Sequence, residues 1–171
     1  KYIVPFPPGG ATDQMSRPLV EALQQRLGVP VVVENIGGAG GSIGSARLAK
    51  ASADGYTIGL GNSATHTITP HMQASLPYDS VRDFTPISML NEYVNVLVVR
   101  QDLPARTMQE FIALARSKPG ALTYGSPGNG STGQLSTELF KTQAKIFVTH
   151  IPYRGSAPML QDLMAGQIQM S

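Results

Sequence analysis

Residues 2–13 read YIVPFPPGGATD: an apolar run, a loop of prolines and glycines, and residues that can begin a helix. The run Tyr2 to Phe6 is typical of a short buried strand. Thr12 or Asp13 is predicted to cap a helix that continues to about Leu27. Because this order of strand, glycine loop and helix recurs along the chain, the sequence predicts an α/β fold with mostly parallel sheets.

Later segments repeat the pattern. Strands are predicted at 30–34, 56–60, 94–99, 122–125 and 146–150, and helices at 43–51, from 107, around 135–140 and at 158–165. The strand at 94–99 is expected to be buried and to cross between two lobes, with lobe I at 1–99 and lobe II at 100–171. The last five residues, QIQMS, resemble the start of a further strand. We therefore expect a truncated chain, in which both lobes are incomplete.

Composition narrows the class of function. The 171 residues carry a net charge of +2 with no run of Lys or Arg, which gives little support for binding to nucleic acid or a membrane surface. The absence of Cys excludes disulfides and thiolate sites. The histidines, His66, His71 and His150, do not have the spacing of metal ligands. No metal or cofactor is expected.

Glycine-rich loops join a predicted strand to a predicted helix at 7–13, 37–42 and 126–133. Free N–H groups at a helix start, together with the helix dipole, favour an anion at such places. Glycine also allows the backbone to approach a ligand closely, although the same glycines could simply form tight turns. Three such loops in one small chain favour binding.

Nucleotide motifs fail at the positions that carry their chemistry. Residues 125–132 have the glycine spacing of a phosphate loop, but Ser131 replaces the lysine. Residues 38–44 read GxGxxxG, and Asn62 follows the next strand where an acidic residue would hold a ribose. A serine hydrolase or acyl transferase that uses Ser131 with His150 remains an alternative, although Ser131 lies one residue short of the GxSxG pattern.

Several segments together resemble one family. VPFPPGGATD at 4–13 is similar to the opening of the Bug receptors, the solute-binding components of tripartite tricarboxylate transporters. The resemblance continues in PVVVEN at 30–35, GAGG at 38–41, ADGYT at 53–57, LPYD at 76–79, DFTP at 83–86 and PYRG at 152–155. These segments cover nearly the whole chain in the expected order.

This resemblance implies a type II periplasmic binding protein-like fold, in which two lobes close on a ligand in the cleft between them. It also implies a periplasmic, non-enzymatic protein that captures a small carboxylate or dicarboxylate and delivers it to a membrane permease. A signal peptide is expected to be absent from these residues. A ligand-sensing domain for a signalling partner is a further alternative. The implied contacts are Phe6, Gly9, Gly10, Ala11, Thr12, Asp13, Asn62, Ser63, Ser126, Gly130, Ser131 and Thr132. Arg154 could pair with a distal charge of the ligand or could stabilise its own loop.

Overall fold

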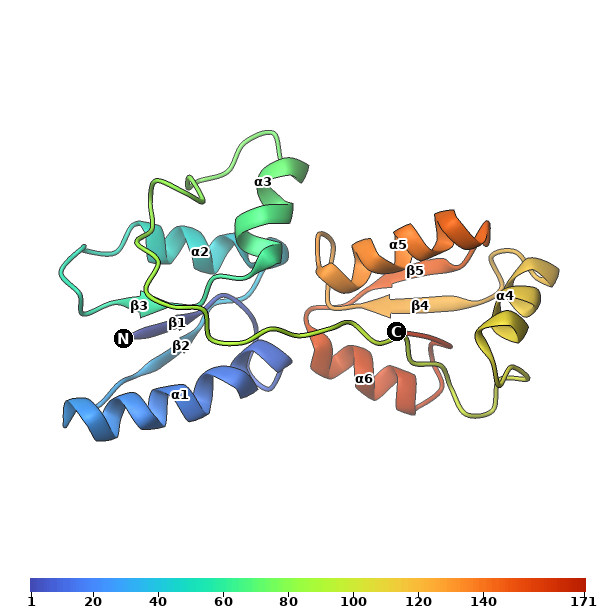
Figure 1. The fold of residues 1–171 in the computed structure, drawn as a ribbon, viewed down its shortest axis with the longest axis horizontal. Coiled ribbons are helices and arrows are strands. Elements are labelled where there is room, and N and C mark those ends of the chain that lie inside the picture. The colour runs from blue at the N-terminus through green and yellow to red at the C-terminus, as the bar shows by residue number, and fades with distance from the viewer. The chain divides into compact units, whose positions relative to one another are not determined.

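The computed structural model describes residues 1–171, which divide into two compact units (Figure 1). Unit 1 is Lys1–Asn91 and unit 2 is Glu92–Ser171, so the boundary precedes the one predicted after Val99. The difference arises because the backbone N–H of Val98 donates to the Ser171 carbonyl at 3.0 Å, which attaches the end of the predicted strand to unit 2. None of the helices is both long and apolar enough to cross a bilayer.

Unit 1 contains a three-stranded parallel sheet in the order β2-β1-β3. Right-handed crossovers from β1 to β2 and from β2 back to β3 run in opposite directions, so α1 and α2 cover opposite faces (Figure 1). In chain order its elements are β1 (Tyr2–Val4), α1 (Ala11–Leu27), β2 (Val33–Asn35), the 3₁₀ turn η1 (Ala39–Gly41), α2 (Ser42–Ala49), β3 (Ile58–Gly59), the π-helical η2 (Ala64–Ile68) and α3 (Thr69–Met72).

Helix α1 begins and packs differently from the sequence prediction. Its N-cap is Gly10, one residue before the first helical residue, and not Thr12 or Asp13. The face it buries is formed by Asp13, Ser16 and Val20, of which Val20 packs in the same cluster as the strand residues Tyr2 and Val4. A polar face is buried at the start of the helix because Asp13 and Ser16 find internal hydrogen-bond partners there.

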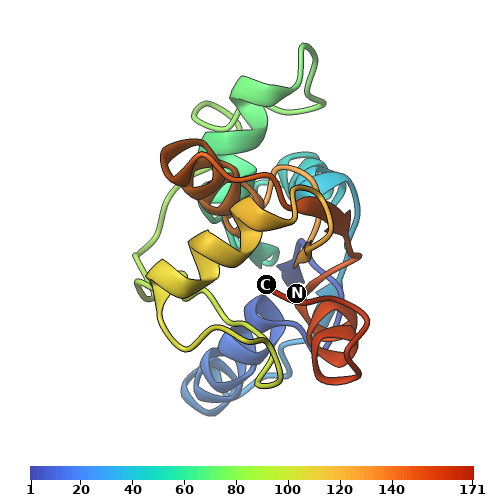
Figure 2. The same cartoon turned by 90° about the vertical axis from the view of Figure 1, so that its right-hand side faces the viewer.

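Unit 2 contains two parallel strands, which Figure 2 shows between α5 and α6. Its elements are α4 (Met108–Ser117), β4 (Thr123–Ser126), α5 (Thr132–Ala144), β5 (Thr149–Pro152) and α6 (Ser156–Met164). Tyr124 and Val148 are completely buried in the main core, together with Phe111, Ala115 and Met170. The predicted α/β class with parallel sheets is confirmed in both units.

The predicted buried strand at 94–99 is wrong over most of its length. Val94 and Val96 are exposed and unpaired, and only Val99 forms a bridge, antiparallel to Met170. Met170 also forms a parallel bridge with Tyr124, and its carbonyl accepts the Gly125 N–H at 2.8 Å. The last residues of the chain therefore extend the unit 2 sheet by single bridges, consistent with the predicted start of a strand.

Candidate functional site

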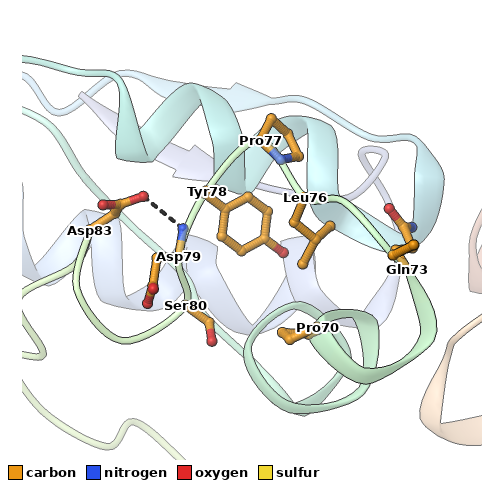
Figure 3. A pocket seen from close by; sticks show the side chains of 9 residues that line it. Pro70, Gln73, Leu76, Pro77, Tyr78, Asp79, Ser80 and Asp83 are labelled. Carbon is orange, nitrogen blue, oxygen red and sulfur yellow. Dashed lines mark hydrogen bonds between the residues drawn. The ribbon is translucent and has the colours of Figure 1, made fainter.

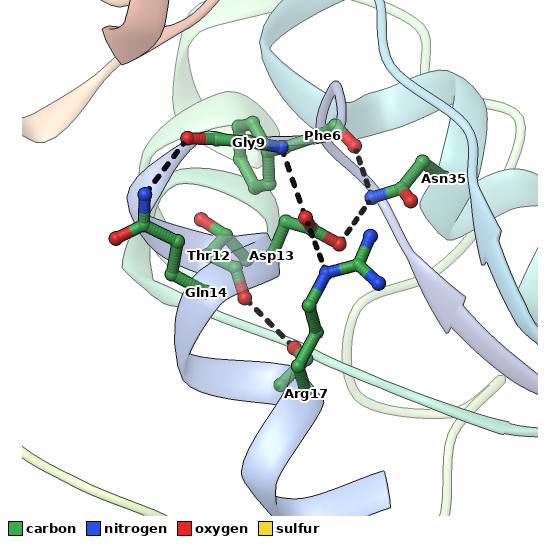
Figure 4. Close-up of polar contacts among 8 residues, drawn as sticks. Phe6, Gly9, Thr12, Asp13, Gln14, Arg17 and Asn35 are labelled. Carbon is green, nitrogen blue, oxygen red and sulfur yellow. Dashed lines mark hydrogen bonds and ion pairs between the residues drawn. The ribbon is translucent and has the colours of Figure 1, made fainter.

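The loop between β1 and α1 is organised around the carboxylate of Asp13 (Figure 4). This side chain is 1% exposed and accepts three hydrogen bonds. The backbone N–H of Gly9 and Nε of Arg17 both donate to Oδ2 at 2.9 Å, and Nδ2 of Asn35 donates to Oδ1 at 3.0 Å. Asn35 Nδ2 also donates to the Phe6 carbonyl at 3.1 Å, so the end of β2 is tied to the loop.

These donors decide the charge state of Asp13. Burial alone would raise the pKa of the carboxyl, but the hydrogen bonds from Gly9, Arg17 and Asn35 outweigh it and hold the pKa below its ordinary value. An ionised Asp13 whose oxygens already accept these bonds would repel a carboxylate. The Gly9 amide, which was predicted to contact a ligand, is instead bonded to the Asp13 carboxylate. The backbone N–H of Asp13 is not involved in this bond.

The start of α1 leaves amides without an internal acceptor. The first intrahelical bond is from Gln14 N–H to the Gly10 carbonyl at 3.0 Å. No acceptor within the protein is found for the N–H groups of Gly10, Ala11, Thr12 and Asp13. Four adjacent free donors at the positive end of a 17-residue helix form an arrangement that suits an anion.

The glycines at 37–44 serve packing beneath this loop. A Cβ on Gly37 would lie 2.8 Å from Cδ of Pro7, and one on Gly41 would lie 2.6 Å from Cγ2 of Thr65. A Cβ on Gly44 would meet backbone, at 2.6 Å from the Cα of Pro5. For this loop the structure supports close packing and tight turns, because the glycines allow α2 to lie against residues 5–7.

Asn62 and Ser63 differ in the hydrogen bonds that their side chains form within the protein. Asn62 and Thr65 exchange hydrogen bonds, with Asn62 Oδ1 accepting the Thr65 N–H at 3.1 Å and Thr65 Oγ1 accepting the Asn62 N–H at 3.1 Å. Thr65 Oγ1 also lies 2.8 Å from Nδ1 of His66, whose pKa is lowered by burial. Ser63 is exposed, and its hydroxyl forms no hydrogen bond within the protein. Asn62 is thus chiefly a turn-forming residue here.

In unit 2, the loop after β4 leads into α5 through a side-chain cap. Ser131 is the N-cap, and its Oγ accepts the Gln134 N–H at 3.2 Å. Gln134 in turn reaches back, and its Oε1 accepts the Gly130 N–H at 2.7 Å. The Gly130 amide, which was predicted to contact a ligand, therefore already donates to Gln134. The Thr132 N–H and Oγ1 have no hydrogen-bond partner within the protein.

The structure does not bring Ser131 together with His150. Nε2 of His150 lies 2.7 Å from Oγ of Ser126 instead, and the imidazole ring stacks on Tyr124 with centroids 4.7 Å apart. Ser126 is fully buried, so this pair does not expose a nucleophile. Arg154 is exposed and has neither an ion pair nor a hydrogen bond, so neither reading of it gains support.

Two residues that position these loops were missed by the sequence analysis. Gln134 stands three residues after Ser131, which is the capping-box spacing, so the sequence carried a signal for it. Asn35 acts across 22 positions from Asp13, and nothing in its own segment distinguishes it from an ordinary strand end.

An open depression of about 580 Å³ lies elsewhere in unit 1 (Figure 3). Asp79 and Asp83 line it, and Asp79 Oδ1 accepts the backbone N–H groups of Arg82 and Val81, which lower the pKa of its carboxyl to about 2. Two carboxylates make it unsuited to an acid. No group of three or more potential ligands for a metal ion occurs in residues 1–171.

Comparison with known proteins gives a consistent result. A family model described as tripartite tricarboxylate transporter family receptor matches residues 15–171. Curated relatives are up to 41% identical, and the chain spans about half of their length, 49% to 53%.

Three solved structures are similar over 99% of this chain. A periplasmic transporter is 38% identical, with a TM-score of 0.91 and 57% of its chain covered. Rpa4515 of R. palustris with adipate is 39% identical, with a TM-score of 0.95 and 57% covered. MatC (Rpa3494) from Rhodopseudomonas palustris with bound malate is 33% identical, with a TM-score of 0.90 and 58% covered. The chain thus has the fold of these proteins over its whole length.

Proposed function

Because the chain belongs to the tripartite tricarboxylate transporter receptor family, we propose that the protein captures a small carboxylate on main-chain amides and delivers it to a membrane permease. The observation that carries this proposal is the set of N–H groups at Ala11, Thr12 and Asp13, which have no internal acceptor. Charge-assisted N–H contacts contribute about 1.5–3 kcal/mol each, so a few of them hold a carboxylate without a lysine.

The Asp13 network supports this assignment by fixing the loop in front of the helix. Gly9 has φ 76°, and its N–H is held by Asp13, so the backbone enters Gly10 in one conformation. Loops fixed in this way bind with a smaller loss of conformational entropy. The second set of donors is the Thr132 amide with the hydroxyls of Ser131 and Thr132, at the start of α5.

The ligand class follows from the relatives and from the absence of a nearby cation. Dicarboxylates occur in two solved relatives, adipate in one and malate in the other. In unit 1 the one cationic side chain in the Asp13 network, Arg17, is paired with Asp13, so recognition would rest on neutral donors. A periplasmic location is part of the proposal, since a solved relative is a periplasmic transporter.

Proline at the first helical position provides a selective test. Ala11 is the first residue of α1 and follows Gly10, whose φ of −77° and ψ of 170° suit a residue before proline. Ala11→Pro removes one free N–H without breaking the helix. Thr132→Pro removes the N–H and also the hydroxyl of Thr132 at the start of α5, after Ser131 with φ −73° and ψ 154°. Isothermal titration of the full-length protein with adipate and malate should show roughly tenfold or greater weakening in each variant.

Met108→Pro is the matched control. It places proline at the first residue of α4, after Thr107 with φ −130° and ψ 160°, in a helix that carries none of the proposed contacts. This variant should bind as the wild type does. Equal affinity of the Ala11→Pro and Thr132→Pro proteins would refute the amide mechanism, and no heat from any di- or tricarboxylate would refute the receptor function.

A further inference from the structure

Five residues of unit 2 form a continuous chain of hydrogen bonds under the loop before α5. Gly130 N–H donates to Oε1 of Gln134 at 2.7 Å, and Nε2 of Gln134 lies 3.4 Å from Nδ1 of His150. Nε2 of His150 lies 2.7 Å from Oγ of Ser126. Ser126 Oγ donates to the Gly128 carbonyl at 3.2 Å, which returns the chain to the loop.

The direction of these bonds fixes the proton on His150. A backbone N–H can only donate, so the Gln134 atom facing Gly130 is the carbonyl oxygen and its NH₂ group faces the imidazole. Nδ1 of His150 must therefore accept, which leaves the proton of a neutral ring on Nε2 as the donor to Ser126. If Nδ1 carried the proton, two donors, Nδ1–H and the Gln134 NH₂ group, would face each other. Rotation of the Gln134 side-chain amide would remove that conflict, but it would leave the Gly130 N–H without its acceptor.

We propose that His150 is a positioning residue of the ligand loop, and that its neutral Nε2–H tautomer holds residues 128–131 in the conformation that presents the Ser131 and Thr132 donors. This inference rests on the proposed function, because it assigns a role in carboxylate binding. The loop depends on such support: Gly128 and Gly130 have φ values of 138° and 76°, so no repetitive structure holds them.

Protonation of His150 would disrupt this arrangement, because a protonated Nδ1 can no longer accept a hydrogen bond from Gln134. The charged groups that face the ring are Glu138 and Lys141 on α5, while β4 contributes the neutral Tyr124 and Ser126. Glu138 is already bound to Lys141 at 2.7 Å and accepts the Tyr124 hydroxyl proton at 2.5 Å. Burial lowers the pKa of His150, so the ring is neutral at pH 7.5 and gains its proton on acidification below the ordinary value of about 6.5.

The tautomer can be measured without any ligand. Long-range ¹H–¹⁵N correlation spectra of the unliganded full-length protein at pH 7.5 should show Nδ1 of His150 unprotonated and Nε2 protonated. The Gly130 amide resonance should shift with the same midpoint as the imidazole during an acid titration. An Nδ1–H tautomer, or an imidazolium at pH 7.5, would overturn the inference whatever the protein binds.

Affinity then tests the link to binding. With adipate as the probe, His150→Phe keeps a ring on Tyr124 but removes both nitrogens, and should weaken binding roughly two- to tenfold at pH 7.5. As the pH falls below the ordinary histidine value of about 6.5, the wild type should lose affinity more steeply than the variant, because protonation of adipate itself affects both proteins alike. Gln134→Glu should move the midpoint of the wild-type profile to higher pH, because its carboxylate accepts from Gly130 and stabilises the imidazolium.

His71→Phe is the control, since His71 is exposed and lies in unit 1. It should reproduce the wild-type affinity and pH profile. His66 is present in all of these proteins, so its titration cancels in the comparison. A wild-type pH profile in His150→Phe would overturn the positioning role. If adipate and malate give no heat with the wild type, the proposed function fails, while the nitrogen spectra still decide the tautomer.

Discussion

Asp13 shows how a single buried charge can fix the conformation of a loop in front of a helix. Its carboxylate is surrounded by donors from the loop, from its own helix and from the end of β2. In this chain the aspartate closes the sequence GGATD at 9–13, and the structure gives a physical reason for its position. The Gly9 amide needs an acceptor once the loop turns away from β1, and Asp13 provides that acceptor.

Asp13→Ala should destabilise unit 1. The change leaves the Gly9 N–H without its acceptor and removes one of the two acceptors of the Asn35 Nδ2 group, and we expect the free energy of unfolding to fall by about 1–3 kcal/mol. Urea denaturation followed by circular dichroism measures the loss. Glu21→Ala, an exposed change on the same helix, should remain within about 0.5 kcal/mol of the wild type. Equal midpoints for the two variants would contradict the structural role.

The same residue should shape the response to acid. Because the folded-state pKa of Asp13 is lowered, its contribution is fully present above the unfolded value of about 3.9 and is lost as the pH falls through the folded value. The stability of Asp13→Asn should therefore decline less steeply than that of the wild type below about pH 4.5. Urea midpoints at a series of pH values test this. Parallel curves would show that Asp13 does not titrate below its ordinary range.

At the scale of the element, two helical glycines have opposite roles. Gly44 in α2 and Gly133 in α5 would each gain about 1 kcal/mol in helix propensity on change to Ala. A Cβ on Gly44 would lie 2.5 Å from the Ile36 carbonyl oxygen, whereas one on Gly133 meets nothing nearer than Pro127 at 3.4 Å. Gly133→Ala should raise the thermal midpoint and Gly44→Ala should lower it, at a net loss of about 1–3 kcal/mol. The same sign for both changes would exclude this packing argument.

Helix α4 is capped at its N-terminus by side chains on both sides of its first turn. Oγ1 of Thr107 accepts the Glu110 N–H at 3.2 Å, and the Glu110 carboxylate accepts the Arg106 N–H at 2.6 Å, one residue earlier than in the standard box. Thr107→Ala should cost about 1 kcal/mol of stability in unit 2, as measured by urea denaturation. Thr107→Ser retains the oxygen and should recover most of that loss. If Thr107→Ser does not recover the stability, the loss in Thr107→Ala comes from the methyl group and not from the capping oxygen.

For the whole molecule, the sequence predicted the fold class, most of the elements in their order, and the three glycine-rich loops that precede helices. Strands, helices and caps are local features, and their signals lie within a few residues. The internal partners of the site residues are not local. Asn35 reaches Asp13, and His150 reaches Ser126 across 24 positions, so neither pairing could be seen in the chain.

The failed strand at 94–99 has the same cause. Its apolar residues predict burial, but burial needs a partner surface, and the described residues supply a bridge only to Val99. A hydrophobic pattern shows that a segment could be buried against an apolar surface. It does not show whether such a surface is present. The same limit applies to α1, whose last residue, Leu27, is apolar and is 61% exposed.

The exposed segment 85–97 leads to a prediction for the chain of residues 1–171. Limited digestion with chymotrypsin should cut first near Tyr93, because its backbone belongs to no element and makes no hydrogen bond. Tyr56 is the internal control: its side chain is more exposed, 82% against 50%, but its N–H donates to Asp54 and its carbonyl accepts from the amino terminus of Lys1. Mass spectrometry of the earliest fragments should give masses near those of units 1–91 and 92–171. First cleavage at Tyr56 would show that side-chain exposure, and not free backbone, governs the opening of this chain.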